Sequence, residues 1–200
     1  MSSTNRSNAR DSHISDYYVT PQKAIREFLI QFQKDENINL STQQQWILDP
    51  CAWWDKENDM SYPAVLFEMW ADYDKIITND LREDSPAQYH YDFITNTKQR
   101  KYDIVITNPP FNEAQKIIEK SLECTIEWWY VIMLLRLNYF WWKVRQNFWK
   151  KYMPIRTYIH NRRMSFTPDW KTDSVEYCHV IWKKGENPDF IKTKILFDFK

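Results

Sequence analysis

Short apolar runs that alternate with segments of helical spacing are the feature that most constrains how this 200-residue chain can fold. Strands made of continuous apolar residues are typical of parallel sheets that helices cover on both faces. We therefore predict an α/β fold with a mostly parallel central sheet, helices on both faces and an antiparallel strand pair near the C-terminus. The expected strands are 46–48, 75–78, 102–107, 130–135, 175–182 and 192–197, and the expected helices are 21–32, 62–69, 113–123 and a stretch after 135.

The charge balance and the cysteine pattern exclude several classes of protein. The chain has 27 Lys and Arg against 27 Asp and Glu, so no bulk positive field would hold a nucleic acid unaided. No apolar run approaches the roughly 18–20 residues of a membrane span, and the polar start of the chain does not look like a secretory signal. The three cysteines lie far apart, without a Cys-x-x-Cys pair, so we expect neither a disulfide framework nor a metal site.

The chain divides into a tail and one domain. Residues 1–15 are rich in Ser, Asn and Arg, which is typical of a flexible tail. No internal repeat or long linker interrupts residues 16–200, so we expect a single domain there, in a soluble, cytoplasmic protein that does not contact membranes. The sequence leaves the oligomeric state open.

Polar residues stand where three expected strands end, at Asp49, Asp80 and Asn108. Sheets of this type bind ligands at the carboxyl ends of their strands. In Asn108-Pro109-Pro110-Phe111, two prolines remove amide donors and stiffen the backbone. The Asn side chain and a neighbouring carbonyl oxygen can then act as two fixed acceptors for an exocyclic amine, while Phe111 offers a ring for its base. In isolation, the same four residues could simply end a strand.

Several segments, in the same order, resemble SAM-dependent DNA adenine N6-methyltransferases of a small phage type; SAM is S-adenosylmethionine. Residues 102–112 resemble their catalytic motif, (Asp/Asn/Ser)-Pro-Pro-(Tyr/Phe/Trp), and the resemblance extends over roughly residues 16–183. It implies a Rossmann-like methyltransferase fold, SAM as cofactor and DNA as partner, in a bacterial or phage-infected cell. The residues that it implies for SAM binding are Tyr18, Thr20, Pro21, Asp49, Pro50, Cys51, Ala52, Asp80, Asp92 and Phe93.

The resemblance also implies how these residues would act. A flipped adenine would stack on Phe111, and the side-chain oxygen of Asn108 and the carbonyl of Pro109 would accept its amine hydrogens, with Pro110 keeping the turn stiff. No metal is required. Asp80 and Asp92 could instead be ordinary strand-end caps or solvated charges.

Local basic clusters would have to hold the DNA, because the net charge does not. A segment around residues 161–166 resembles one that lies near DNA in phage-type relatives. The same lysines and arginines could equally form an ordinary solvated surface. The candidates are Lys143, Arg145, Arg162, Arg163 and Ser165.

Glycine is nearly absent, whereas tryptophan is abundant: the chain has 1 Gly and 11 Trp. Seven tryptophans stand where the family or the local turn asks for glycine, above all Trp53-Trp54 in the first SAM loop, where backbone must approach the cofactor. We hypothesise that UGA codons meant as glycine have been read as tryptophan. The alternative is an aromatic-rich protein whose SAM loop has decayed. The seven positions are Trp53, Trp54, Trp128, Trp129, Trp141, Trp142 and Trp170.

Two other functions stay open at this point. The chain could methylate RNA bases or a protein glutamine, because an Asn-Pro-Pro-aromatic turn suits any planar amine or amide. With the tryptophans taken literally, it could be a catalytically dead, methyltransferase-like binding protein.

Overall fold

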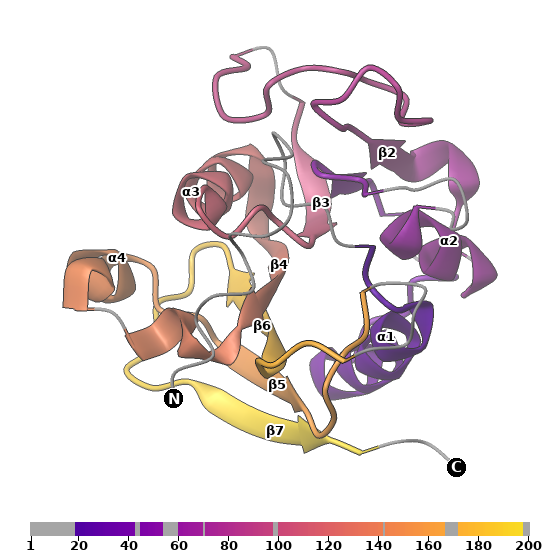
Figure 1. Cartoon of the computed structure of the whole chain (residues 1–200). Coiled ribbons are helices and arrows are strands. Elements are labelled where there is room, and N and C mark those ends of the chain that lie inside the picture. Colours follow the sequence, from indigo (N-terminus) through magenta and orange to yellow (C-terminus); the bar gives the residue numbers. More distant parts are fainter. Residues whose placement is uncertain are drawn as a thin grey trace, which may run out of the picture.

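A seven-stranded sheet forms the centre of the computed structural model, which describes residues 19–42, 45–53, 60–69, 71–97, 100–141, 143–166 and 172–197. The strand order is β2-β1-β3-β4-β6-β5-β7 (Figure 1). The predicted tail, residues 1–15, lies outside the described residues. The strands are β1 (Ile47–Asp49), β2 (Ile76–Thr78), β3 (Tyr102–Thr107), β4 (Thr125–Arg136), β5 (Arg156–His160), β6 (Tyr177–Lys183) and β7 (Lys192–Leu196).

The sheet is mostly parallel, which confirms the predicted fold class. Strands β2, β1, β3 and β4 run parallel, whereas β6 is antiparallel to both of its neighbours, β4 and β5. The two C-terminal runs expected from the sequence are β6 and β7, and they are not adjacent, because β5 lies between them and pairs in parallel with β7. Strand β5 was not predicted: Arg-Thr-Tyr-Ile-His is short and contains three polar residues rather than an apolar run.

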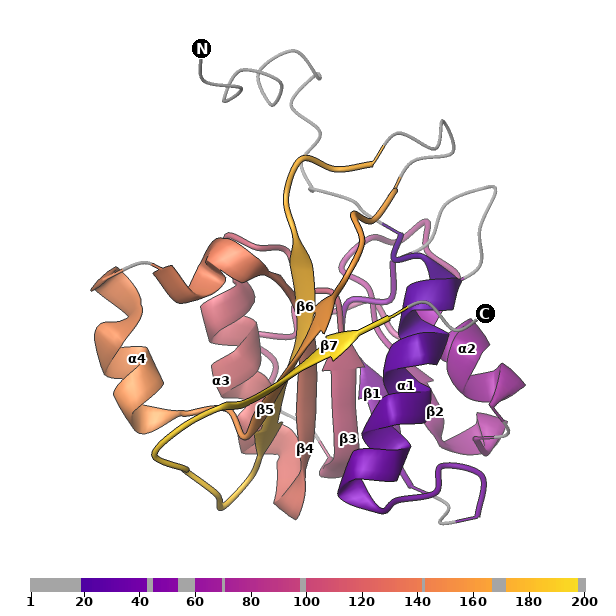
Figure 2. The same cartoon turned by 90° about the horizontal axis from the view of Figure 1, so that it is seen from below.

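Helices cover both faces of this sheet, as predicted. Figure 2 shows α1 and α2 on one side and α3 and α4 on the other. The aromatic-rich stretch after β4 is not one helix: it consists of two 3-10 turns, at 137–141 and 143–145, and the short α4. The α-helices are α1 (Gln22–Glu36), α2 (Ser61–Glu68), α3 (Ala114–Cys124) and α4 (Gln146–Lys151).

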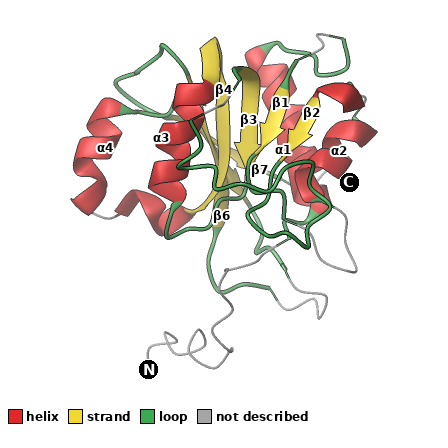
Figure 3. Ribbon diagram, turned by 90° about the horizontal axis from the view of Figure 1, so that it is seen from above, coloured by secondary structure: helices red, strands yellow, loops and turns green. Residues whose placement is uncertain are grey.

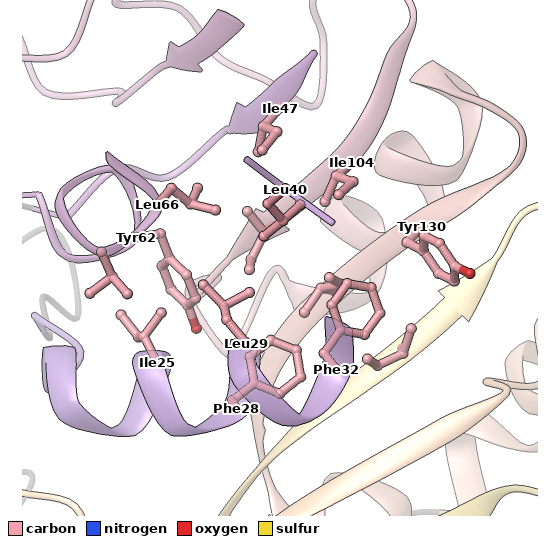
Figure 4. Close-up of a cluster of buried hydrophobic side chains, with 14 of the residues drawn as sticks. Ile25, Phe28, Leu29, Phe32, Leu40, Ile47, Tyr62, Leu66, Ile104 and Tyr130 are labelled. Carbon is pink, nitrogen blue, oxygen red and sulfur yellow. The ribbon is translucent and has the colours of Figure 1, made fainter. Parts of the chain in front are cut away.

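Alternate residues of each central strand fill opposite cores, which explains why the strands read as continuous apolar runs. Ile47 and Ile104 pack with α1 and α2 in the cluster drawn in Figure 4. Their neighbours Leu48 and Val105 pack with α3 on the other face. Helix α1 contributes Ile25, Phe28, Leu29 and Phe32.

The ends of α1 differ slightly from the expected ones. Pro21 occupies the N-cap position rather than the first turn, and no side chain caps the helix. Thr20 is buried instead. At the other end, Asn37 adopts the left-handed conformation (φ 52°), and its N–H donates to the Gln33 carbonyl, a common helix stop.

No helix among the described residues is long and apolar enough to span a membrane. The three cysteines are all free thiols, with Cys124 and Cys178 buried.

Candidate active site

The carboxyl ends of β1, β2 and β3 meet at one edge of the sheet. Strand β1 lies between β2 and β3, so the chain leaves it in one direction and later returns on the other side. The loops that follow these three strands gather there (Figure 3). Asp49 is the last residue of β1, Asp80 follows β2, and Asn108 follows β3. This is the switch point at which such sheets bind ligands, and the structure brings the three predicted polar residues to it.

Asn79 ties the loops at this edge together, a role the sequence analysis missed. Its carbonyl accepts from Ala52 N at 2.8 Å, and its Nδ2 donates to the Pro50 carbonyl at 3.0 Å. The same amide bonds the backbone of Tyr91 through both of its polar atoms, each at 3.1 Å. The loop 50–52 is therefore fixed by the end of β2. The sequence signal was an Asn directly after a strand and before Asp80.

Asp49 is a buried carboxyl, 1% exposed. Its Oδ1 accepts from Cys51 N at 3.2 Å. Its pKa is raised to about 7: burial is the largest cause and the nearby Asp80 adds to it, whereas bonds from Thr107 and Cys51 act in the opposite direction. Near neutral pH this carboxyl is thus close to half-protonated, and a cation placed beside it would favour its ionised form.

Asp80 is also buried, and its Oδ1 accepts from Arg82 N at 2.9 Å. Burial raises its pKa, although the backbone and charge of Arg82 lower it. The Arg82 Nε lies 4.0 Å from the other carboxylate oxygen. The contacts with Arg82 therefore fix one oxygen of Asp80 just after the end of β2.

The predicted pair Asp92-Phe93 separates into two environments. Asp92 is exposed and caps a turn, accepting from Ile94 N and Thr95 Oγ1, each at 2.9 Å. These bonds match the cap that the sequence left as an alternative. Phe93 is buried against Leu48 and Val105 in the core on the α3 side.

The Asn-Pro-Pro-Phe turn connects β3 to α3. Asn108 and Pro109 are buried, whereas Pro110 and Phe111 are half-buried. The Pro110 carbonyl accepts from Glu113 N at 3.0 Å, just before α3 begins. Upstream, Thr107 Oγ1 donates to the Cys51 carbonyl at 3.3 Å. The turn therefore lies beside the loop that follows β1.

Phe111 is packed by segments from distant parts of the chain. Ala24 of α1 and Tyr177 of β6 belong to the same cluster, so the predicted segment around Thr20-Pro21 lies close to the turn. The Phe111 and Tyr177 ring centroids are 6.0 Å apart, and the Arg136 guanidinium lies 4.4 Å from the Phe111 centroid. Tyr18, the other residue predicted in this segment, lies outside the described residues.

Trp53 fills the interval between the β1 loop and the Asn108 turn. It is buried, and its indole Nε1 donates to the Asn108 backbone carbonyl. This is the loop in which the family resemblance asks for glycine. Its neighbour Trp54 lies outside the described residues, as do Trp142 and Trp170.

Trp128 adopts a backbone conformation that favours glycine, with φ 70°. Instead of the expected tight turn before residue 130, β4 already begins at Thr125, and its pairing with β3 is irregular there. Only Asn37 shares a positive φ among the described non-glycine residues, and for a bulky aromatic residue this region is a genuine outlier. Trp129 is half-buried, and Trp141 is exposed.

The predicted DNA-contacting residues lie on segments at the same edge, but several already have protein partners. Arg162 donates to the buried Glu27 at 2.7 Å, and Arg145 donates to the Tyr139 carbonyl at 3.1 Å. Arg163 lies 3.8 Å from Glu176. Lys143 is exposed, and Ser165 is half-buried.

Across the described ranges, no three His, Cys, Asp or Glu side chains gather in a way that could hold a metal ion.

Comparison with known proteins identifies both a family and a fold. Residues 22–132, more than half of the chain, match the sequence profile of a family described as Eco57I restriction-modification methylase. A proposed RNA methyltransferase from Pyrococcus horikoshii superposes with a TM-score of 0.62 at 12% identity, over 88% of this chain and 91% of that one. No curated protein sequence matches the chain.

Two solved restriction-modification proteins share the fold as well. The type IIG restriction endonuclease BpuSI superposes with a TM-score of 0.61 at 11% identity, over 89% of this chain. The type I restriction enzyme EcoKI M protein does so with a TM-score of 0.57 at 13% identity, over 88%. The chain spans 27% of the length of the first and 47% of the second. At such identities these likenesses show the fold alone, which is that of SAM-dependent methyltransferases.

Proposed function

The chain belongs to the Eco57I restriction-modification methylase family, and from this premise we propose that it transfers a methyl group from SAM to the N6 amine of a flipped adenine in DNA. The observation that carries the proposal is the position of the Asn-Pro-Pro-Phe turn. It follows β3 directly at the switch point and lies beside the loop after β1, to which Thr107 joins it through the Cys51 carbonyl. A base amine that enters this edge would meet both segments at once.

SAM is the cofactor that the family and the fold imply. When bound, it supplies a methyl group. The electron pair of the methyl carbon–sulfur bond stays on sulfur when that bond breaks. Two buried carboxyls at the switch point support this cofactor: Asp80, after β2, would receive the ribose hydroxyls, and Asp49, whose pKa is raised to about 7, would take its ionised form beside a cationic ligand. Trp53 conflicts with SAM binding at this edge, because its indole occupies the space next to Asn108.

The turn's own atoms would prepare the amine for attack. The Asn108 side-chain oxygen and the Pro109 carbonyl would accept its two hydrogens, which directs the nitrogen lone pair outward. The same two acceptors favour the positive charge that grows on nitrogen as the new bond forms, after which one proton leaves the amine. Phe111 would stack on the base and hold its plane.

The DNA would approach the edge where the β5–β6 loop and the 3-10 turns after β4 lie. Among the predicted contacts, the exposed Lys143 best suits this role, whereas Arg162 is engaged with Glu27 and Arg163 lies near Glu176. The reaction would take place in the cytoplasm, where bacterial or phage DNA is found.

The test is labelled methyl transfer from SAM to unmethylated DNA by two purified full-length chains. One has the sequence as given; the other has glycine at the seven tryptophan positions named above. Because Trp53 lies against the Asn108 turn, we expect transfer by the glycine chain and little by the chain as given. No transfer to DNA by either chain would refute the proposal. RNA and protein substrates tested in parallel would then distinguish another methyltransferase from an inactive binding protein.

A further inference from the structure

Arg136 contacts the ring of Phe111, and the proposed reaction gives this arginine no role. Arg136 is the last residue of β4, so it stands at the same edge as the Asn-Pro-Pro-Phe turn. Its guanidinium lies over the Phe111 ring, 4.4 Å from the centroid. A cation this close to an aromatic face is attracted by the ring's quadrupole, more strongly where water is partly excluded. Phe111 is half-buried, so water screens this contact only in part.

Tyr177 holds Arg136 from the neighbouring strand. The two residues are directly opposite each other in the β4–β6 pair, and the Tyr177 hydroxyl is hydrogen-bonded by Arg136. The same hydroxyl donates to Asp173 Oδ2 at 2.5 Å. Burial and this bond to Asp173 raise the pKa of Tyr177 above its ordinary value, so the phenol keeps the proton that it donates.

Asp173 belongs to the β5–β6 loop, whose described parts are 161–166 and 172–176. Its backbone N–H donates to the Met164 carbonyl at 2.8 Å, which joins the two described parts. Met164 packs in the same cluster as Tyr177 and Phe111. The residues on either side of Met164 are Arg163 and Ser165, both predicted to contact DNA.

We propose that Arg136 is a positioning residue for Phe111, and that Asp173, Tyr177 and Arg136 connect the DNA-facing loop to the ring on which the target base stacks. Because the guanidinium lies over one face of the ring, the base would have to stack on the opposite face. DNA that binds this loop would thereby orient the Phe111 ring on which its own flipped adenine stacks. This inference rests on the proposed function.

The test uses substitutions that keep the fold. Arg136→Lys retains a cation for the ring, whereas Arg136→Gln keeps a polar but shorter side chain and removes the charge. Tyr177→Phe removes only the hydroxyl that bonds Arg136 and Asp173. The matched control is Tyr130→Phe, which also removes one hydroxyl from a buried tyrosine of this sheet, one that donates to Glu36 at 3.2 Å far from the turn. All are made in whichever of the two chains transfers methyl groups.

We expect Arg136→Gln and Tyr177→Phe to lower kcat on DNA about tenfold, in line with the loss of one partly buried cation–π or charged hydrogen-bond contact. SAM affinity, measured by calorimetry, should be unchanged, and Arg136→Lys should recover most of kcat. Tyr130→Phe should match the parent.

Three outcomes would overturn the inference in different ways. Equal kcat for Arg136→Gln and Arg136→Lys in an active enzyme would refute the role of Arg136 alone. A parent chain that methylates no DNA would refute the proposed function, and the role of Arg136 with it. A loss of kcat that is matched by lost SAM affinity or by a lower unfolding midpoint would show a structural role, which also contradicts the proposal.

Discussion

Replacing Asp49 by asparagine should remove a specific pH dependence from the free energy of unfolding. Asp49 has a pKa of about 7 in the folded protein, against an ordinary value of 3.8. The folded chain therefore keeps a proton that the unfolded chain releases between about pH 4 and 7. The free energy of unfolding falls as pH rises through this window and is constant above it. A shift of about three units at 1.36 kcal/mol each corresponds to a fall of about 4 kcal/mol.

Asparagine cannot ionise, but it keeps the oxygen that accepts from Cys51 N. The difference in free energy of unfolding, Asp49→Asn minus parent, should therefore grow by about 3 kcal/mol from pH 4.5 to 8, which is the part of the total that falls in this window. Urea unfolding at several pH values measures it, and other titrating groups cancel in the difference.

Asp35 offers a control of opposite sign. Burial raises its pKa, but hydrogen bonds from Lys194 and Tyr158 outweigh burial and hold the pKa below its ordinary value. The folded form therefore favours ionised Asp35, and the parent gains stability relative to Asp35→Asn as pH rises through the acid range. If the Asp49→Asn difference were flat with pH, or had the same sign as that of Asp35→Asn, the raised pKa of the buried Asp49 carboxyl would be refuted.

Four further predictions follow from the same structure. Burial lowers the pKa of His160 to about 3. In the Asp49→Asn protein, this residue should therefore lower the free energy of unfolding by about 2 kcal/mol as the pH falls from 7 to 5. Urea unfolding measures the change, and a constant free energy of unfolding would contradict the burial of His160 as a neutral base. Trp128→Gly should raise the free energy of unfolding by about 1–2 kcal/mol by relieving a positive φ, and the gene should carry UGA there; a UGG codon or a loss of stability would refute the glycine hypothesis. Trp53→Gly should tighten SAM binding about tenfold or more in calorimetry, whereas unchanged affinity would show that the indole does not obstruct the site. Asn108→Ala should abolish methyl transfer and leave SAM affinity nearly intact; lost SAM affinity would contradict its role on the amine.

The parallel part of the fold was predictable because its strands are buried on both faces. Residues 102–107 read as a continuous apolar run, since alternate side chains enter two cores, and the structure places β3 there with the same bounds. The run 130–135 was recognised only in part: β4 starts at Thr125, because its first residues are polar or exposed and carry no such signal.

Strand β5 could not be predicted from local sequence patterns. Arg156 is held by Glu36 at 2.9 Å, and Tyr158 donates to Asp35 at 2.9 Å, so this strand is fixed by contacts with the end of α1 that lie far away in the sequence. Nothing local distinguishes it from a loop. The same holds for the order of β6, β5 and β7, which depends on tertiary pairing rather than on local pattern.

The candidate site was predictable where chemistry is concentrated in short motifs. Asp49, Asp80 and Asn108 were expected at strand ends, and the structure brings them to one edge. Asn79 was missed because its role depends on hydrogen bonds with the backbone of two loops that are distant in the sequence. Arg136 was missed because a single arginine after a strand has no recognisable spacing.

The most direct test of the central claim is nucleoside analysis of DNA after incubation with SAM and the glycine-substituted chain. The DNA is digested to nucleosides, and methylated products are separated and identified by mass spectrometry. We predict that N6-methyldeoxyadenosine is found after this reaction and is absent after the reaction with the Asn108→Ala variant. Methylation of cytosine, or no methylated nucleoside at all, would contradict it.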